Sequence, residues 1–139
     1  MTLQSVPTAI SVQLNWNPAF SYAKIPEGLG KGTLPEGLTA VPDYWRILAA
    51  PVSPEQGLPH IRNIRISDLK AMDSSQAFGV SAYPEAVLRD FEFRNLDIQA
   101  KTAGSIQNAQ DWKFTDTRIT TADGSHVTVK DSKGIVGLP

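Results

Sequence analysis

The sequence predicts an all-β solenoid of about three to four coils, in which short strands wind repeatedly over one another. Two recurring features between residues 61 and 137 indicate this fold. In the first, an Asn or Asp precedes an apolar–charged–apolar triplet, and another Asn or Asp follows two positions later. Its copies are Asn63–Leu69, Asp90–Leu96 and Asp111–Thr117. The second feature is an apolar segment that follows each copy, at Phe78–Val80, Gly104–Ile106 and His126–Val129.

The two features share one period. The first recurs at Ile64, Phe91 and Trp112, and the second recurs at Val80, Ile106 and Val127. For both features, the interval along the chain between the second and third copies is shorter than that between the first and second, by a similar number of residues. The two features therefore follow the same repeat. Strands that repeat every roughly 20 to 30 residues are typical of solenoids. Because stacked coils place equivalent residues about 4.8 Å apart, we expect the internal pairs Phe91/Trp112, Phe93/Phe114 and Ile106/Val127.

Composition narrows the possible partners. The 139 residues suit a single domain, and 41% hydrophobic with 19% charged residues is typical of a globular chain. A formal net charge of −1 and the lack of a Lys/Arg run argue against nucleic acid and anionic membranes as partners. The chain has no cysteine, which excludes disulfides and thiolate metal sites. No apolar run approaches the length needed to span a bilayer.

The beginning of the chain, up to Tyr22, predicts a strand followed by an aromatic loop. Residues 9–15 alternate apolar and polar, as in a half-buried strand, and Pro18 ends it. The loop carries Asn15, Trp16, Asn17 and Tyr22. It fits a sugar platform, because ring faces stack on pyranose C–H groups and amides bind hydroxyls. A hydrophobic plug under a loop explains the same residues equally well.

The rest of the chain predicts a long irregular loop and then the solenoid. Residues 23–59 are rich in proline and glycine, and we expect an ordered excursion packed on the solenoid flank. Residues 121–125 predict a turn in which Gly124 supplies any positive φ, and residues 130–139 begin one more strand. The expected inward positions are Ile64, Ile66, Leu69, Phe78, Val80, Val87, Phe91, Phe93, Leu96, Ile98, Ile106, Trp112, Phe114, Ile119, Val127 and Val129.

The recurring Asn and Asp residues flank the first strand of each copy, as Asn63/Asp90/Asp111 and Asp68/Asn95/Asp116. Short Asx side chains suit tight turns, so we interpret both sets as corners. A carboxylate pair, Asp90 with Asp111 or Asp68 with Asp116, is the enzymatic alternative. A separation of about 5 Å would suit a retaining glycosidase. The histidines, His60 and His126, have no partner motif, so we expect no metal site.

Several segments, in order along the whole chain, resemble the C-terminal part of bacterial family 28 glycoside hydrolases, the polygalacturonase-like pectin enzymes. They are residues 10–18 with Tyr22, 59–64, 96–104, 108–112 and 121–124. The resemblance implies a right-handed parallel β-helix and a parent that is usually secreted or periplasmic and hydrolyses pectic glycosidic bonds by inversion. It also implies that Trp16 matches an aromatic at the edge of the sugar cleft, with Asn15, Asn17 and Tyr22 as its sequence neighbours.

The family's catalytic motifs are missing from the sequence. Asn-Thr-Asp, Asp-Asp, Gly-His-Gly and Arg-Ile-Lys do not occur. We therefore expect an incomplete glycoside hydrolase, the remainder of a longer protein, that is inactive alone, needs no cofactor and contacts pectic or other polysaccharide weakly. The alternative is a small β-helical carbohydrate-binding or oligomeric assembly module. An uncapped solenoid end exposes strand edges, so we expect self-association through the N-terminal end, or residues 23–59 folded over it.

Overall fold

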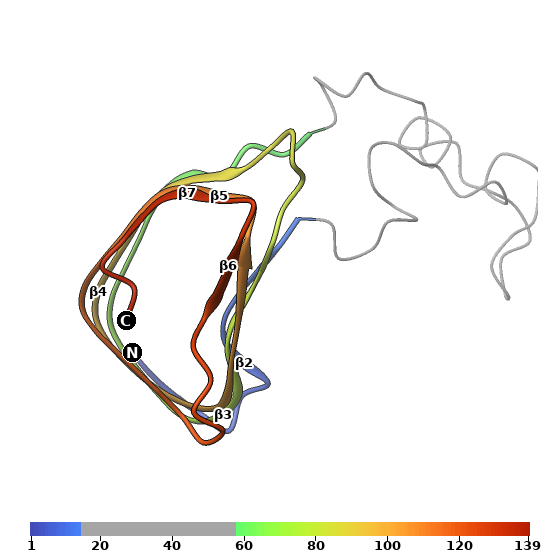
Figure 1. Ribbon diagram of the computed structural model, residues 1–139. Helices are drawn as coiled ribbons and strands as arrows, with labels where there is room; N and C mark the ends of the chain where they lie inside the picture. Colours follow the sequence, from blue (N-terminus) through green and yellow to red (C-terminus); the bar gives the residue numbers. More distant parts are fainter. Residues whose placement is uncertain (15–57) are drawn as a thin grey trace, which may run out of the picture. The chain divides into compact units, whose positions relative to one another are not determined.

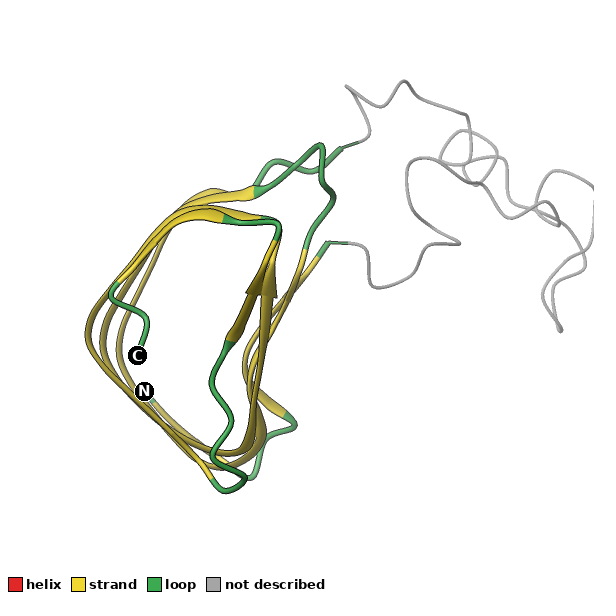
Figure 2. Ribbon diagram, viewed as in Figure 1, coloured by secondary structure: helices red, strands yellow, loops and turns green. Residues whose placement is uncertain are grey.

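A computed structural model describes residues 1–14 and 58–139. Every regular element in these residues is a β-strand, and none is a helix (Figure 2). The predicted all-β class is therefore confirmed for the described part of the chain. Most of the predicted excursion at 23–59 lies outside the described residues, so its packing and the prediction of a single domain over 1–139 stay predictions.

The seven strands form one sheet, and every strand pair in it is parallel. The order β1-β3-β4-β5-β7 makes the main path, while β2 pairs with β3 and β6 pairs with β4. The strands are β1 (Thr2–Gln4), β2 (Thr8–Gln13), β3 (Arg62–Ser81), β4 (Leu88–Gln107), β5 (Ala109–Thr121), β6 (Thr128–Lys130) and β7 (Lys133–Val136).

Neighbouring strands are in register over most of their length. Along β3 and β4, Ile64 pairs with Phe91 and Val80 with Ile106, and along β4 and β5, Phe93 pairs with Phe114. Figure 1 shows β3, β4 and β5 following the same bent path around a common interior. β4 therefore follows the path of β3, and β5 follows the first part of β4, so that paired residues of the three strands form columns.

The bends require left-handed backbone at matching positions. The first corner is Asn63, Asp90 and Asp111, with φ of 58°, 56° and 57°; the second is Asp68, Asn95 and Asp116, with φ of 56°, 52° and 51°. Asn and Asp adopt this conformation more readily than other residues that have a Cβ. The interpretation of both sets as structural corners is confirmed.

Inward side chains stack in the columns that the sequence predicts. Phe91 lies on Trp112 with ring centroids 4.5 Å apart and planes 5° from parallel. Phe93 lies on Phe114 at 4.6 Å and 9°. Phe78, from the far end of β3, meets Phe93 edge-on at 6.1 Å. Offset-stacked and edge-to-face ring contacts are both favourable beyond the burial of the rings. These contacts therefore join the far end of β3 to the aromatic residues of β4 and β5.

Three expected inward positions differ from the prediction. Val87 is half-buried and its neighbour Leu88 is fully buried in the core instead, whereas the other half-buried members, Ile66, Ile119 and Val127, pack against the core. Ile64 and Val129 continue the interior columns but are 36% and 40% exposed. Among the described residues, no further strand is stacked over β6 or over the part of β3 that holds Ile64. The third predicted pair is wrong as well: Ile106 pairs with Val129, not Val127.

The turn before β6 explains the shifted pair. Ala122 and Asp123 donate backbone hydrogen bonds to Ala100 and Lys101, and Ala103 donates to the Ser125 hydroxyl. These bonds hold the turn against β4, and Gly124 takes a φ of 72° within it as expected. The turn is thus longer than the sequence period suggests, which moves Val129 into the column of Ile106.

The left-handed corners predict an unusual order of stabilities. At Asp90, glycine should give a more stable protein than alanine, because a Cβ in left-handed backbone costs about 1–2 kcal/mol. At Arg89, one residue earlier and also exposed, the order should reverse, because glycine in an ordinary strand costs about 0.5–1 kcal/mol relative to alanine. Urea unfolding of the four variants measures both orders, and alanine equal to or better than glycine at position 90 would contradict the corner assignment.

Candidate functional site

The residues that the sequence predicts for sugar contact are Asn15, Trp16, Asn17 and Tyr22. All four lie outside the described residues, so their arrangement stays a prediction. The described residues instead form a shallow pocket on the outer surface of β3, β4 and β5. It is lined by Asn63, Arg65, Asp90, Glu92, Asp111 and Lys113.

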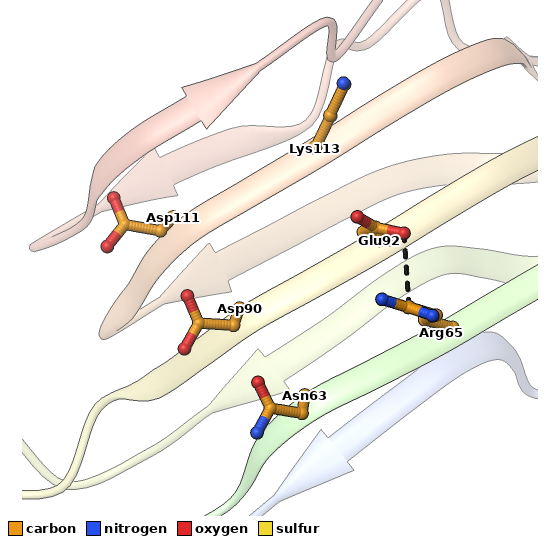
Figure 3. A pocket seen from close by; sticks show the side chains of 6 residues that line it. All are labelled: Asn63, Arg65, Asp90, Glu92, Asp111 and Lys113. Atoms are coloured by element: carbon orange, nitrogen blue, oxygen red, sulfur yellow. Dashed lines mark ion pairs between the residues drawn. The ribbon is translucent and has the colours of Figure 1, made fainter.

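The pocket consists of two columns (Figure 3). Asn63, Asp90 and Asp111 form the first, and Arg65, Glu92 and Lys113 form the second, two positions later on each strand. Between the columns, Phe91 and Trp112 point into the core, because successive side chains of a strand alternate between faces. The same in-register pairing that stacks the rings inside therefore stacks polar groups outside.

Charge is mixed within the pocket. Arg65 Nε lies 3.3 Å from Glu92 Oε2, and Arg94 Nη2 lies 4.0 Å from the same oxygen. The Arg65 side chain is 83% exposed, so solvent screens the pair and it contributes little to stability. With three carboxylates and two cations among its lining residues, the pocket has no excess positive charge that would attract a polyuronate.

The carboxylates of the pocket do not match an inverting glycosidase. Asp90 and Asp111 lie at neighbouring positions on adjacent strands, which run about 4.8 Å apart. Inversion needs carboxyl groups about 6.5–9.5 Å apart, on opposite sides of the sugar bond. Asp111 also accepts a hydrogen bond of 2.9 Å from Gln110 Nε2. The strand spacing is close to the one that a retaining pair requires, so the retaining alternative stays a prediction. The left-handed backbone of both aspartates gives each a structural role at the corner.

The second corner is bonded within itself. Asn95 Nδ2 donates to Asp68 Oδ1 at 2.7 Å across adjacent strands, and this bond lowers the pKa of Asp68. Asn95 stands between Asp68 and Asp116 in the column, so these two aspartates are not neighbours. The candidate pair Asp68 with Asp116 is therefore separated by a full strand, and the corner provides no adjacent carboxylates.

A third polar contact lies beyond the corners. Arg118 donates to both carboxylate oxygens of Asp97, at 3.1 and 2.8 Å. The bidentate bond lowers the pKa of Asp97 and raises that of Arg118. A hydrogen bond from the Ser125 hydroxyl likewise lowers the pKa of Asp123. The lowered pKa values keep the carboxylates of Asp97 and Asp123 ionised. An ionised carboxylate suits a hydrogen-bond acceptor in a turn or an ion pair and not a general acid.

His60 and His126 are both exposed. Within residues 1–14 and 58–139, no group of three or more His, Cys, Asp or Glu side chains is placed to hold a metal ion. Over the same residues, no helix is long and apolar enough to cross a membrane.

No role was predicted for Arg65, Glu92 and Lys113. A signal was present, because each is the charged middle residue of a repeated triplet, and middle residues of an apolar–charged–apolar strand must face outward together. Gly134 was also missed. It extends the first corner into β7 with a φ of 67°, and a Cβ there would collide with Asp111.

Comparison of the chain with protein-family models, with curated proteins and with solved structures found no match.

The Asp97–Arg118 contact predicts a pH dependence. Because the folded-state pKa of Asp97 is lowered below its ordinary 3.8, its stabilisation is present above that pH and is lost as the pH falls through the folded-state value. Asp97→Asn should therefore lose less stability than the wild type between pH 5 and acid pH. Urea midpoints across that range measure the loss.

Arg118→Gln is the matched control for this pH effect. It removes the other half of the same contact, so it should reduce the acid dependence similarly, and the double variant should add nothing further. Additive effects of the two substitutions would show that Asp97 owes its acid sensitivity to another neighbour.

Proposed function

We propose that the described strands are consecutive coils of a right-handed parallel β-helix. The support is the parallel pairing at offsets of one coil: Asn95 bonds Asp68 across 27 residues, and Arg118 bonds Asp97 across 21 residues. A parallel strand pair needs a long connection, and here the chain's own bent path supplies it (Figure 1). A solenoid of this kind presents an extended outer surface, which suits a polymeric ligand.

On this fold, the function we infer is that of the C-terminal β-helix portion of a polygalacturonase-like glycoside hydrolase. The parent reaction is hydrolysis of pectic polysaccharide by inversion, and this chain is inactive alone. The single observation that carries the proposal is the agreement between the repeated, in-register parallel strands and the ordered sequence segments that resemble that family. The lack of the family's catalytic motifs, and carboxylate pairs that fit corners, support inactivity.

Contact with the polysaccharide is assigned to Trp16, with Asn15, Asn17 and Tyr22 beside it. An indole face stacks on sugar C–H groups, while amide and phenol groups bind hydroxyls. The charged pocket of β3, β4 and β5 is a poorer candidate, because its carboxylates would repel the uronate groups of a pectic chain.

The second candidate is a carbohydrate-binding or assembly module with no catalytic parent reaction. The observation that favours it is that every aspartate in the two corner columns has left-handed backbone, a structural reason for its presence. On this reading, the missing motifs reflect a chain whose β-helix serves only to bind or to assemble.

Two measurements test the proposal together. Incubation with polygalacturonate should release no reducing ends above background, whereas Trp16→Ala should weaken binding to immobilised polygalacturonate by about tenfold, the loss of one stacking contact of roughly 1–1.5 kcal/mol. Trp45→Ala, at a tryptophan with no predicted sugar role, is the matched control and should bind as the wild type does.

Each assay has an outcome that contradicts the proposal. Release of reducing ends that Asp90→Asn or Asp111→Asn abolishes would make the first corner a catalytic pair. No binding of the wild type to polygalacturonate or to neutral polysaccharides would remove the sugar contact altogether and leave assembly as the function.

A further inference from the structure

The N-terminal end of the described strands is uneven. β1 pairs with Lys70–Met72 and β2 with Gln76–Ser81, so both cover later parts of β3. The first part of β3, residues 62–67, pairs only with β4 among the described residues, whereas Met1 bonds to Asp68 and Lys70. We call β1, β2 and this uncovered stretch the N-terminal end surface. Over residues 62–67 this surface lacks the strand that covers the rest of β3.

The C-terminal end has the opposite shape. β7 pairs with Gln110–Lys113, the part of β5 that is equivalent to the start of β3. The later part of β5, residues 118–121, and all of β6 pair only with β4 among the described residues. We call β7, β6 and residues 118–121 the C-terminal end surface. This surface therefore has an additional strand, β7, at the place in the path where the N-terminal end surface lacks one.

The two end surfaces also match by side chain. If one copy is placed on another with the strands continuing at the same spacing, three inward columns meet. In each column, an apolar residue of one copy would lie on an apolar residue of the next. The residues of a column are found by following the paired positions from strand to strand within the chain. The pairs across the junction are Ile135 on Ile64, Ile119 on Leu3, and Val129 on Val12.

These same residues are incompletely covered in the single chain. Ile64 is 36% and Val129 40% exposed, and Leu3, Val12, Ile119 and Ile135 are half-buried. Exposed parallel edges with apolar inward residues favour pairing with another strand. One unfavourable contact opposes it, because Lys133 would lie beside Arg62 of the next copy. Both are exposed, so solvent screens their repulsion.

From this complementarity we propose that the 139-residue chain associates head to tail, with the C-terminal end surface of one copy seated on the N-terminal end surface of the next. The contact is heterologous, since two different surfaces meet, and it extends into open stacks and not into closed dimers. The inference rests on the stacked strands and is independent of the polysaccharide function proposed above.

Two single-end variants test the geometry. Ile64→Lys places a charge in the N-terminal end surface, and Val129→Lys places one in the C-terminal end surface. The mass of the wild type, measured by light scattering, should rise with concentration above the 15.1 kDa of one chain. Each variant alone should stay at that mass. An equimolar mixture should form a heterodimer of twice that mass, because each variant supplies the end that the other lacks.

Competing arrangements give different results. Dimers of Val129→Lys alone would show contact between two N-terminal ends, and dimers of Ile64→Lys alone would show contact between two C-terminal ends; either would overturn the proposal. A wild type that stays monomeric at all concentrations would do the same. In that case, cover of the N-terminal end from within the chain, which residues 23–59 are expected to provide, becomes the favoured explanation.

A cysteine pair gives a test that does not depend on how the lysine variants fold. Gln13 and Lys130 are exposed, and they occupy one column, three strand spacings apart within a chain. That is about 14 Å, beyond the reach of a disulfide, whereas across the junction they would be adjacent. Because the chain has no natural cysteine, the Gln13→Cys/Lys130→Cys variant should form a ladder of oxidised multimers on a non-reducing gel.

The control is Gln13→Cys/Thr120→Cys. Thr120 is exposed on the C-terminal end surface, but its column is that of Gln99 and lies elsewhere in the path. This variant should give no ladder. Equal ladders from both double variants would mean random collision of exposed thiols, and no ladder from either would contradict the junction.

Discussion

Parallel pairing in register is the constraint on which the rest of this structure depends. β4 pairs with β3 in register on either side of one irregularity between Ala71 and Ser74, and β5 pairs with the first part of β4. Each paired residue must therefore fit the residues that lie above and below it in the stack. A bend in one strand must then be a bend in all of them. This is why the corner residues form columns of Asn and Asp, and why Gly134 continues the first column where a Cβ would meet Asp111.

The same constraint builds the interior from like residues. Two stacked aromatic pairs occupy one wall, and Phe78 meets Phe93 and Phe114 edge-on from another, with centroids 6.1 and 6.0 Å apart. Small buried residues fill the remaining narrow places; they are Ala71, Ala77, Ala82, Ala86, Ala100, Ala103 and Ala109. Buried polar groups are few and mostly bonded: Asn108 donates to the Ala82 carbonyl and Trp112 to that of Leu88, while the Ser74 hydroxyl, beside the irregularity in β3, has no partner.

Stacking also determines what the outer surface can do. Charged residues two positions after each corner become a column, and their mixed signs let Arg65 pair with Glu92. Strand spacing brings Asp90 and Asp111 close together, at a separation that does not suit inversion but is close to that of a retaining pair. Among the described residues, Ile64 and Val129 continue the inward columns at the two ends and are 36% and 40% exposed.

From the sequence we could predict the all-β class of the described residues, the Asx corners and the stacked pairs Phe91/Trp112 and Phe93/Phe114, because these depend on local patterns that repeat along the chain. The sequence placed the candidate sugar residues around Trp16 by resemblance, a region outside the described residues. It did not find the charged pocket, which exists only once three strands lie side by side.

The register of β6 could not be predicted from the sequence. Val127 and Val129 point to the same face of a strand, so a shift of two residues leaves the hydrophobic pattern unchanged. The hydrogen bonds that hold residues 122–125 against β4 fix the length of the turn and so choose Val129. The exposure of Ile64 was likewise settled by the absence of a strand stacked over it among the described residues, since a residue's pattern along its own strand carries no information about the next layer.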